Sequence, residues 1–177
     1  MLDADVEALL RGCIRDIPDF PKPGILFRDL TPLLANADAL RAAVRAIADP
    51  FRGDEIDCVL GTEARGFIFG AAVALELGAG FVPARKPGKL PHTTHSASYE
   101  LEYGTDEVEM HIDGVRPGER VLVVDDLIAT GGTAVATVAL ARQAGGILVG
   151  CAFLVELGAL EGRKALEVDR IHSVLTY

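Results

Sequence analysis

Hydrophobic residues along this chain alternate between two kinds of run. Short continuous stretches such as 121–124 (Val-Leu-Val-Val) are typical of strands that are buried on both faces of a parallel sheet. A stripe with helical spacing follows at 134–144, and the same order recurs where 58–61 is followed by 67–77. The other stretches predicted as strands are 80–84, 147–157 and 171–177. This alternation predicts an α/β fold, an open and mostly parallel sheet flanked by helices.

Helical stripes also occupy the start of the chain. Residues 6–17 predict a helix capped by Asp3 or Asp5, and a second helix is predicted over 38–50. Between them, 17–29 is too rich in proline for regular structure and too apolar for a solvated linker. This segment must pack on something, either the surface of its own domain or a ligand, and the residues alone favour neither.

A change to strict alternation marks a β-hairpin. Residues 97–103 and 107–113 alternate polar and apolar positions and are joined by Gly104-Thr105-Asp106, which predicts two antiparallel strands. The polar residues just before them, 92–96, predict a flexible lid. Two histidines in that segment have no cysteine or carboxylate at ligand spacing, so a metal site is not favoured.

The composition is that of one compact domain. The chain has 177 residues, 50% of them hydrophobic, which suits a single domain over 1–177 with a proper core. The formal charge of −9 argues against nucleic acid as a partner, because nucleic-acid binding needs a basic face. We expect no membrane partner either, because no segment reaches the roughly 18 uninterrupted apolar residues of a span.

The cysteines and the N-terminus indicate the compartment. Cys13, Cys58 and Cys151 lie far apart in apolar patterns, without the paired spacing of a disulfide framework or a zinc site. The first residues are acidic and lack the apolar core of a signal peptide. We therefore expect a cytoplasmic protein with reduced thiols.

The central strand leads into the stretch with the clearest chemistry. Asp125 and Asp126 close the apolar run, so we expect their carboxylates at the carboxyl edge of the sheet, where open α/β sheets bind ligands. Thr130-Gly131-Gly132-Thr133 lets the backbone turn and points amides at an anion from the start of a helix. A triphosphate-binding P-loop has a lysine at the position of Gly132. The inferred ligand carries one phosphate and a ribose diol, whose hydroxyls carboxylates bind well; the alternative is an ordinary glycine-rich turn.

This pair of acids before a glycine-rich loop resembles the signature of the type I phosphoribosyltransferases, which use 5-phosphoribosyl 1-pyrophosphate (PRPP) with Mg²⁺. The resemblance implies that Asp125 and Asp126 hold the ribose of PRPP. The residues implied to hold the 5′-phosphate are Ala129, Thr130, Gly131, Gly132 and Thr133. No direct protein ligand is implied for Mg²⁺, which PRPP mainly carries. The resemblance also implies an N-terminal hood over 1–35 and a lid, made of a loop and a β-hairpin, over 85–113.

Residues 17–29 contain Pro-Asp-Phe-Pro, Pro-Gly and Phe-Arg-Asp, which resemble the hood of the adenine phosphoribosyltransferases. The resemblance implies that Phe27 stacks on the purine. It also implies that the backbone of Leu26 faces the 6-amino group and that of Arg28 the adjacent ring nitrogen. A 6-oxo purine reverses this donor and acceptor pattern, which would leave buried groups unpaired at a cost of about 1–3 kcal/mol each.

Two further segments resemble the parts of this family that bind diphosphate. Thr62-Glu63-Ala64-Arg65-Gly66 is similar to the loop that holds diphosphate through Arg65, although many relatives have Asp-Ser where this chain has Glu-Ala. The run 85–91 concentrates cations; Lys89 is implied to bind diphosphate and Arg85 to reach the site of a neighbouring subunit, which implies a homodimer. On pattern alone these would be a turn arginine and a solvated charge cluster.

The 101–104 corner of the hairpin (Leu-Glu-Tyr-Gly) is similar to the catalytic lid of the family. Glu102 is implied to handle a proton near N7 and N9 of adenine, and Tyr103 to close the site. By pattern alone Glu102 is merely an exposed strand carboxylate.

The function implied by the whole resemblance is purine salvage, in which adenine and PRPP give AMP and diphosphate. The residues implied to be catalytic are Arg65, Lys89, Glu102 and Asp125. Two alternatives stay open. One is a sibling transferase for a 6-oxopurine, and the other is a regulator that binds PRPP without catalysis.

Overall fold

The computed structural model describes residues 2–100 and 105–177, which fall into two compact units, Met1–Ala46 and Ile47–Tyr177. The first unit contains the whole range 1–35 of the predicted hood, and the second carries the predicted sheet and lid. No helix in these described residues is both long and apolar enough to cross a bilayer. That residues 1–177 act as one domain stays a prediction.

The helices of the first unit are α1 (Ala4–Gly12), α2 (Thr31–Ala35) and α3 (Ala37–Ala48). Asp3 caps α1 as predicted, because its carboxylate accepts the backbone amides of the first turn. The helix predicted over 38–50 corresponds to α3, whose last turn is followed by the 3₁₀ helix η1 (Asp49–Phe51).

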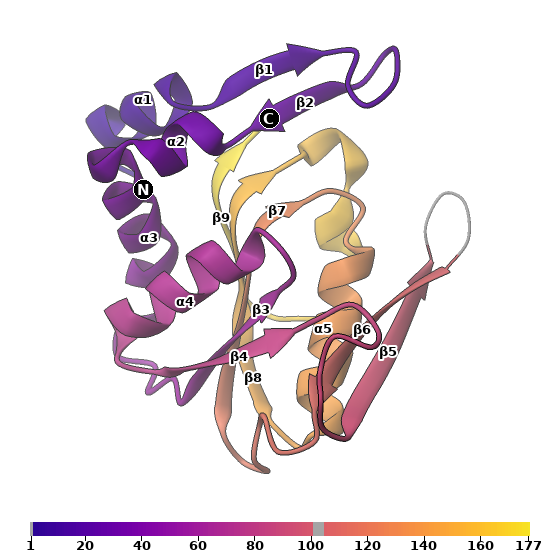
Figure 1. Cartoon of the computed structure of the whole chain (residues 1–177). Helices are drawn as coiled ribbons and strands as arrows, with labels where there is room; N and C mark the ends of the chain where they lie inside the picture. Colours follow the sequence, from indigo (N-terminus) through magenta and orange to yellow (C-terminus); the bar gives the residue numbers. More distant parts are fainter. Residues whose placement is uncertain (1, 101–104) are drawn as a thin grey trace. The chain divides into compact units, whose positions relative to one another are not determined.

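The prediction that the first helix continues to residue 17 was wrong. Residues 15–18 form β1 (Arg15–Pro18), which pairs antiparallel with β2 (Leu26–Asp29) (Figure 1). The segment 17–29, predicted to lack regular structure, is therefore a hairpin with an irregular tip. Arg15 donates to Asp29 Oδ2 from Nε at 3.0 Å and from Nη2 at 2.7 Å, and this ion pair holds the two strands together.

The second unit is built on the predicted parallel sheet. Its five strands are β4 (Gly80–Ala84), β3 (Cys58–Thr62), β7 (Arg120–Ile128), β8 (Ile147–Glu156) and β9 (Ile171–Thr176), in that spatial order. Every neighbouring pair is parallel. The central strands are buried along most of their length, which explains their unbroken apolar sequence.

Helices cover both faces of this sheet (Figure 1). The chain passes from β3 to the edge strand β4 through α4 (Gly66–Leu77). It passes from β7 to β8, in the opposite direction across the sheet, through α5 (Gly132–Gln143). Right-handed crossovers in opposite directions place α4 and α5 on opposite faces. The direction reverses between β3 and β7, and that switch point is where sheets of this kind bind ligands.

The predicted hairpin is present as β5 (Thr94–Glu100) and β6 (Thr105–His111), which pair antiparallel and pack against α5 (Figure 1). Val108 and Met110 from β6 join the same buried cluster as residues of α5. Within the segment 92–96, predicted as a flexible lid, residues 94–96 pair with 109–111 as the start of β5. That this segment acts as a flexible lid stays a prediction.

Candidate active site

A cavity of about 480 Å³ opens in the second unit at the switch point of the sheet. Pairing between β3 and β7 runs from Cys58–Val121 only to Gly61–Val124, so β7 continues past Val124 without β3 beside it. The described residues that line the cavity are Glu63, Ala64, Arg65, Lys86, Tyr99 and 125–134. They include the acids, the glycine-rich loop and one of the arginines predicted from the sequence.

The glycine-rich loop ends at the N-terminus of α5. Gly131 is the N-cap and has φ 89°, a left-handed backbone conformation that glycine adopts readily. No side chain caps this helix. Amides in a first helical turn have no partner inside the helix, so the end of the loop presents N–H groups and the positive end of the helix dipole to the cavity. This geometry suits a phosphate.

A second glycine, which the sequence analysis did not single out, fixes the position of this loop. A Cβ on Gly131 would lie 2.5 Å from the carbonyl oxygen of Gly162, and a Cβ on Gly162 would overlap the carbonyl oxygen of Ala129. Gly162 begins the 3₁₀ helix η3 (Gly162–Ala165). The loop and η3 therefore touch backbone to backbone, which only residues without side chains permit.

Glu156 and Arg163 hold η3 in place. The guanidinium donates to both carboxylate oxygens of Glu156, at 3.2 and 2.7 Å, and also to the carbonyl oxygen of Ile171 at 2.9 Å. The pair thus ties η3 to the ends of β8 and β9. Its hydrogen bonds from Arg163 lower the pKa of Glu156 below its usual value.

The prediction that the acids end the central strand was wrong, because β7 continues to Ile128. Asp125 nevertheless lies just where pairing with β3 stops. Its Oδ1 accepts the backbone amide of Asp126 at 2.8 Å and lies so close to α4 that a Cβ on Gly66 would come within 2.5 Å of it. Burial, together with the neighbouring charge of Asp126, raises the pKa of Asp125 well above its usual value.

Asp126 is 5% exposed and faces Arg65, the N-cap of α4. The Nε atom of Arg65 lies 2.6 Å from Asp126 Oδ2, but the two are not aligned as a hydrogen bond. Among the described residues Oδ2 thus accepts no hydrogen bond although it is buried. Such a buried carboxylate oxygen can accept a hydrogen bond from a hydroxyl group of a ligand or from a water that the ligand carries.

The cationic loop 85–89 is held by acids of the same chain. Arg85 donates to both carboxylate oxygens of Glu63 at 3.1 Å, and its Nη1 donates to the carbonyl oxygen of Lys89 at 3.2 Å. These hydrogen bonds from Arg85, with a further one from the Lys86 amide, lower the pKa of Glu63. Neither Arg85 nor Lys89 is among the described residues that line the cavity, whereas Lys86 is.

Lys86 and Tyr99 are the cavity residues that sequence reasoning missed. The Lys86 ammonium donates to the Tyr99 hydroxyl at 3.0 Å and forms an ion pair with Asp106. The Tyr99 hydroxyl donates to Asp106 at 3.0 Å. The predicted hairpin placed Asp106 in the turn, whereas Thr105 and Asp106 belong to β6 and Asp106 pairs with Tyr99. Neither this pairing nor the approach of Lys86 could be read from the sequence.

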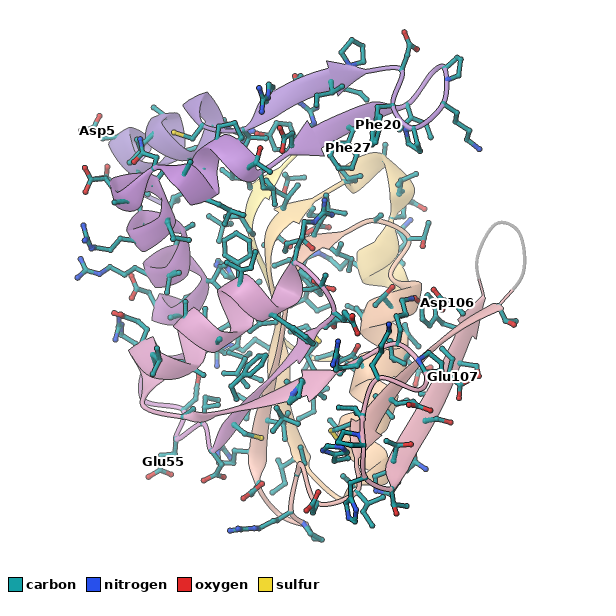
Figure 2. The ribbon with its side chains drawn as sticks, viewed as in Figure 1. Asp5, Phe20, Phe27, Glu55, Asp106 and Glu107 are labelled. Atoms are coloured by element: carbon teal, nitrogen blue, oxygen red, sulfur yellow. The ribbon has the colours of Figure 1, made fainter. Side chains whose placement is uncertain are left out.

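The residues predicted to bind adenine belong to β2 of the first unit. The ring of Phe27 meets that of Phe20 edge to face, with centroids 5.1 Å apart (Figure 2). Arg28 forms an ion pair with Asp16 on β1, and Leu26 is 46% exposed. Glu102 and Tyr103 lie outside the described residues.

In 2–100 and 105–177, no group of three His, Cys, Asp or Glu side chains is close enough to hold a metal ion. The rings of His92 and His111 approach to 5.9 Å, and the His92 amide donates to His111 Nε2 at 3.3 Å. This contact joins the segment just before β5 to the last residue of β6.

Comparison with known proteins places this site in context. A family model described as "Phosphoribosyl transferase domain" matches residues 30–175. The chain is 56% identical to the adenine phosphoribosyltransferase of Thermobifida fusca over 175 residues, which cover 99% of each protein. It is 58% identical to that of Methylococcus capsulatus over 168 residues, 95% of this chain and 98% of the relative.

Solved structures agree with the sequence comparison. The adenine phosphoribosyltransferase of Rhodothermus marinus has a TM-score of 0.94 at 54% identity, covering 99% of this chain and 100% of that one. The enzyme from Saccharomyces cerevisiae, solved with adenine and an imino-altritol bisphosphate, has a TM-score of 0.92 at 38% identity and covers 98% and 100%. The type I fold predicted from the sequence is confirmed.

Proposed function

The chain belongs to the phosphoribosyltransferase family, within it to the adenine phosphoribosyltransferases, and we propose that it makes AMP and diphosphate from adenine and PRPP. It is accordingly a pentosyltransferase of purine salvage. The observation that carries the proposal is the cavity itself, which is lined by an uncapped helix N-terminus and by two acids, the buried Asp126 and the partly buried Asp125. That combination suits a ligand with one terminal phosphate and a sugar diol.

The phosphoribosyl part of PRPP occupies the cavity along β7. The 5′-phosphate accepts hydrogen bonds from the amides of 129–133, with the Thr130 and Thr133 hydroxyls within the same loop. The ribose hydroxyls donate to Asp125 and Asp126, which supplies the donor that Asp126 Oδ2 lacks.

The leaving diphosphate extends toward the cations beside the cavity. Arg65 lines the cavity, and Lys89 lies in the loop next to it. Both stabilise the negative charge that grows on the diphosphate as its bond to the sugar breaks. Arg85 of a neighbouring subunit is proposed as a third cation. To bind the diphosphate, this arginine must first break its hydrogen bonds to Glu63.

Mg²⁺ is the proposed cofactor, and it arrives with PRPP. The donor set fits this role, because the carboxylates of Glu63, Asp125 and Asp126 line the cavity and one buried oxygen, Asp126 Oδ2, is able to accept from a metal-bound water. When bound, Mg²⁺ neutralises part of the diphosphate charge. Asp125 and Asp126 hold the sugar hydroxyls and waters around it.

Adenine is read by the first unit. Pro18 faces Leu26 across the β1–β2 ladder and has no N–H, so this pair cannot exchange two hydrogen bonds. By alternation the main-chain groups of Leu26 and Arg28 point away from β1. They are therefore oriented to face a base edge, and Phe27, supported by Phe20, supplies the stacking ring.

The chemical step is a substitution at C1′ of PRPP. The N9 lone pair of adenine forms the new C1′–N bond, the C1′–O bond breaks, and both its electrons leave with the diphosphate. The N9 proton passes to Glu102, and Tyr103 closes the site so that water does not compete as the nucleophile. Asp125 stabilises the positive charge that develops on the ribose.

The experiment that tests this function supplies PRPP, Mg²⁺ and one purine at a time: adenine, hypoxanthine, guanine or xanthine. We expect AMP from adenine and no nucleotide from the 6-oxo purines. Turnover of hypoxanthine would reject the backbone readout by Leu26 and Arg28 while keeping the PRPP site. Binding of PRPP without turnover of any base would reject the enzyme and leave a regulator.

We further propose a cytoplasmic homodimer. Two of the three free cysteines, Cys58 and Cys151, are buried as thiols, which suits a reducing compartment. The dimer is needed if Arg85 serves a neighbouring site.

A further inference from the structure

Lys86 connects the cavity to the hairpin through a closed set of polar contacts. Its ammonium touches the Tyr99 hydroxyl and the Asp106 carboxylate, and the Tyr99 hydroxyl donates to the same Asp106 oxygen. Lys86 and Tyr99 both line the cavity, whereas Asp106 does not. Figure 2 labels Asp106 near the end of the hairpin.

The position of this cluster on the hairpin is significant. Tyr99 and Asp106 are opposite each other in the β5–β6 register, one pair before the strands end at Glu100 and Thr105. Glu102, the proposed proton acceptor, lies in the sequence between these two strand ends. The ion pair therefore links the cationic loop to the part of the lid nearest its proposed catalytic group.

Asp106 is not required to hold the cationic loop. Glu63 already accepts the amide of Lys86 at 3.1 Å, and Arg85 exchanges two main-chain hydrogen bonds with Glu109, at 2.8 and 2.7 Å. The side chain of Glu109 accepts the amide of Gly88 at 3.1 Å. With the backbone held by these bonds, Asp106 controls only where the Lys86 ammonium lies.

Diphosphate bound in the cavity is a stronger partner for the Lys86 ammonium than the Asp106 carboxylate is. The side chains of Lys86 and Asp106 are 38% and 32% exposed, so water and ions reach the pair. A diphosphate carries several negative charges, and a single carboxylate competes with it poorly for the same ammonium.

Resting on the function proposed above, we propose that Asp106 is a positioning residue that competes with diphosphate for Lys86. Without ligand, Asp106 and Tyr99 hold the ammonium at the edge of the cavity. Diphosphate, as part of PRPP or as product, takes the Lys86 ammonium from Asp106 and Tyr99, while the main-chain bonds between Arg85 and Glu109 keep the loop on the hairpin. When the product leaves, the Lys86 ammonium returns to Asp106. This competition from Asp106 lowers the affinity for diphosphate and so allows its release.

The test compares Asp106→Asn with Glu107→Gln, the same loss of one charge at the next residue, whose side chain leaves the other face of β6 (Figure 2). The probe is inorganic diphosphate with Mg²⁺, titrated calorimetrically. We expect Asp106→Asn to bind it about threefold to tenfold more tightly, and Glu107→Gln to change the affinity less than about twofold. Equal effects of the two variants would overturn the proposal, because a general charge effect would then suffice.

A double-mutant cycle isolates the role of Lys86. In the Lys86→Met background, Asp106→Asn should leave diphosphate affinity unchanged, and persistence of its effect would overturn the proposal. Tyr99→Phe is the milder variant if Asp106→Asn does not fold; it should tighten diphosphate binding in the same direction, and weaker binding would overturn the idea.

Kinetics separate this inference from the function on which it rests. Asp106→Asn should lower both KM for PRPP and kcat, because product leaves more slowly, and Asp106→Glu should restore both. A wild-type protein that makes no AMP would reject the proposed function, while its diphosphate titrations would still decide the role of Asp106. An active wild type with unchanged KM and kcat in Asp106→Asn would reject only the role of Asp106.

Discussion

At the scale of single residues, the Asp125 carboxylate that is proposed to bind the ribose also lowers the stability of the folded protein at neutral pH. Its pKa in the folded protein lies above the value of about 3.9 in an unfolded chain, so the folded state binds that proton more tightly. The stability that Asp125 contributes is therefore greatest at acid pH and is lost as the pH rises through the folded pKa.

Asp125→Asn should accordingly raise the free energy of unfolding near pH 7.5 by about 1 kcal/mol and weaken PRPP binding about tenfold or more. Thermal unfolding between pH 4 and 8 and calorimetric PRPP titration measure the two effects. Asp113→Asn, an exposed acid in a turn, is the control. Unchanged PRPP affinity would show that Asp125 does not hold the ribose.

The cysteines give a second prediction at this scale. Burial raises the pKa of Cys58 to about 11 and that of Cys151 to about 12, so both are thiols at neutral pH. Cys13 is only partly buried. A chromogenic disulfide reagent at pH 8 should modify one thiol in the folded protein and three after denaturation; rapid modification of two or more in the folded protein would contradict this.

The residues of the site were predictable to different degrees. Asp125 and Asp126 lie in the part of β7 beyond its pairing with β3, and the glycine-rich loop follows that strand, so the topology itself brings them to the cavity. Lys86 and Lys89 are three apart in one irregular loop, and the sequence favoured Lys89 through resemblance. Which lysine faces the cavity depends on bonds from Glu63 and Asp106, which are distant in sequence.

At the scale of elements, the contact between the phosphate-binding loop and η3 makes a sharp prediction. Gly162→Ala places a methyl group on the Ala129 carbonyl and must displace the loop. We expect KM for PRPP to rise about tenfold or more while the sheet stays folded, as judged by circular dichroism.

Gly158→Ala is the matched control, because its Cβ would lie 3.2 Å from a Thr176 methyl group, which a small shift can relieve. It should leave KM within about twofold of the wild type. If both variants behave alike, η3 does not determine the position of the loop.

Elements deep in the fold were predicted well, and those at its margins were not. The parallel strands are recognisable because they are buried on both faces over 58–60 and 121–124, where every position is apolar. Residues 15–18 continue the helical stripe of α1, yet they pair with β2, and the bond from Arg15 to Asp29 that fixes this pairing spans 14 positions. Residues 94–96 are polar, but β6 supplies their partners.

At the scale of the whole molecule, α4 shows how the chain can associate. Glu76 is the only charged residue of this helix, and two apolar residues seven positions apart, Ile68 and Leu75, are 43% and 84% exposed. Residues with this spacing share one helical face. An exposed apolar face of this kind suits contact with a second copy, the homodimer proposed above.

Replacing Ile68 and Leu75 together with glutamate should dissociate the dimer, because four like charges would meet at a two-fold interface. Sedimentation at micromolar concentration should show a dimer for the wild type and a monomer for the variant. Ile112→Glu, at another exposed apolar position, is the control and should remain dimeric. If Arg85 completes the neighbouring site, the monomer also loses most of its AMP formation while it still binds PRPP through the loop of its own chain. A monomer with full activity would reject the role of Arg85 across the interface and leave its pairing with Glu63 as its function.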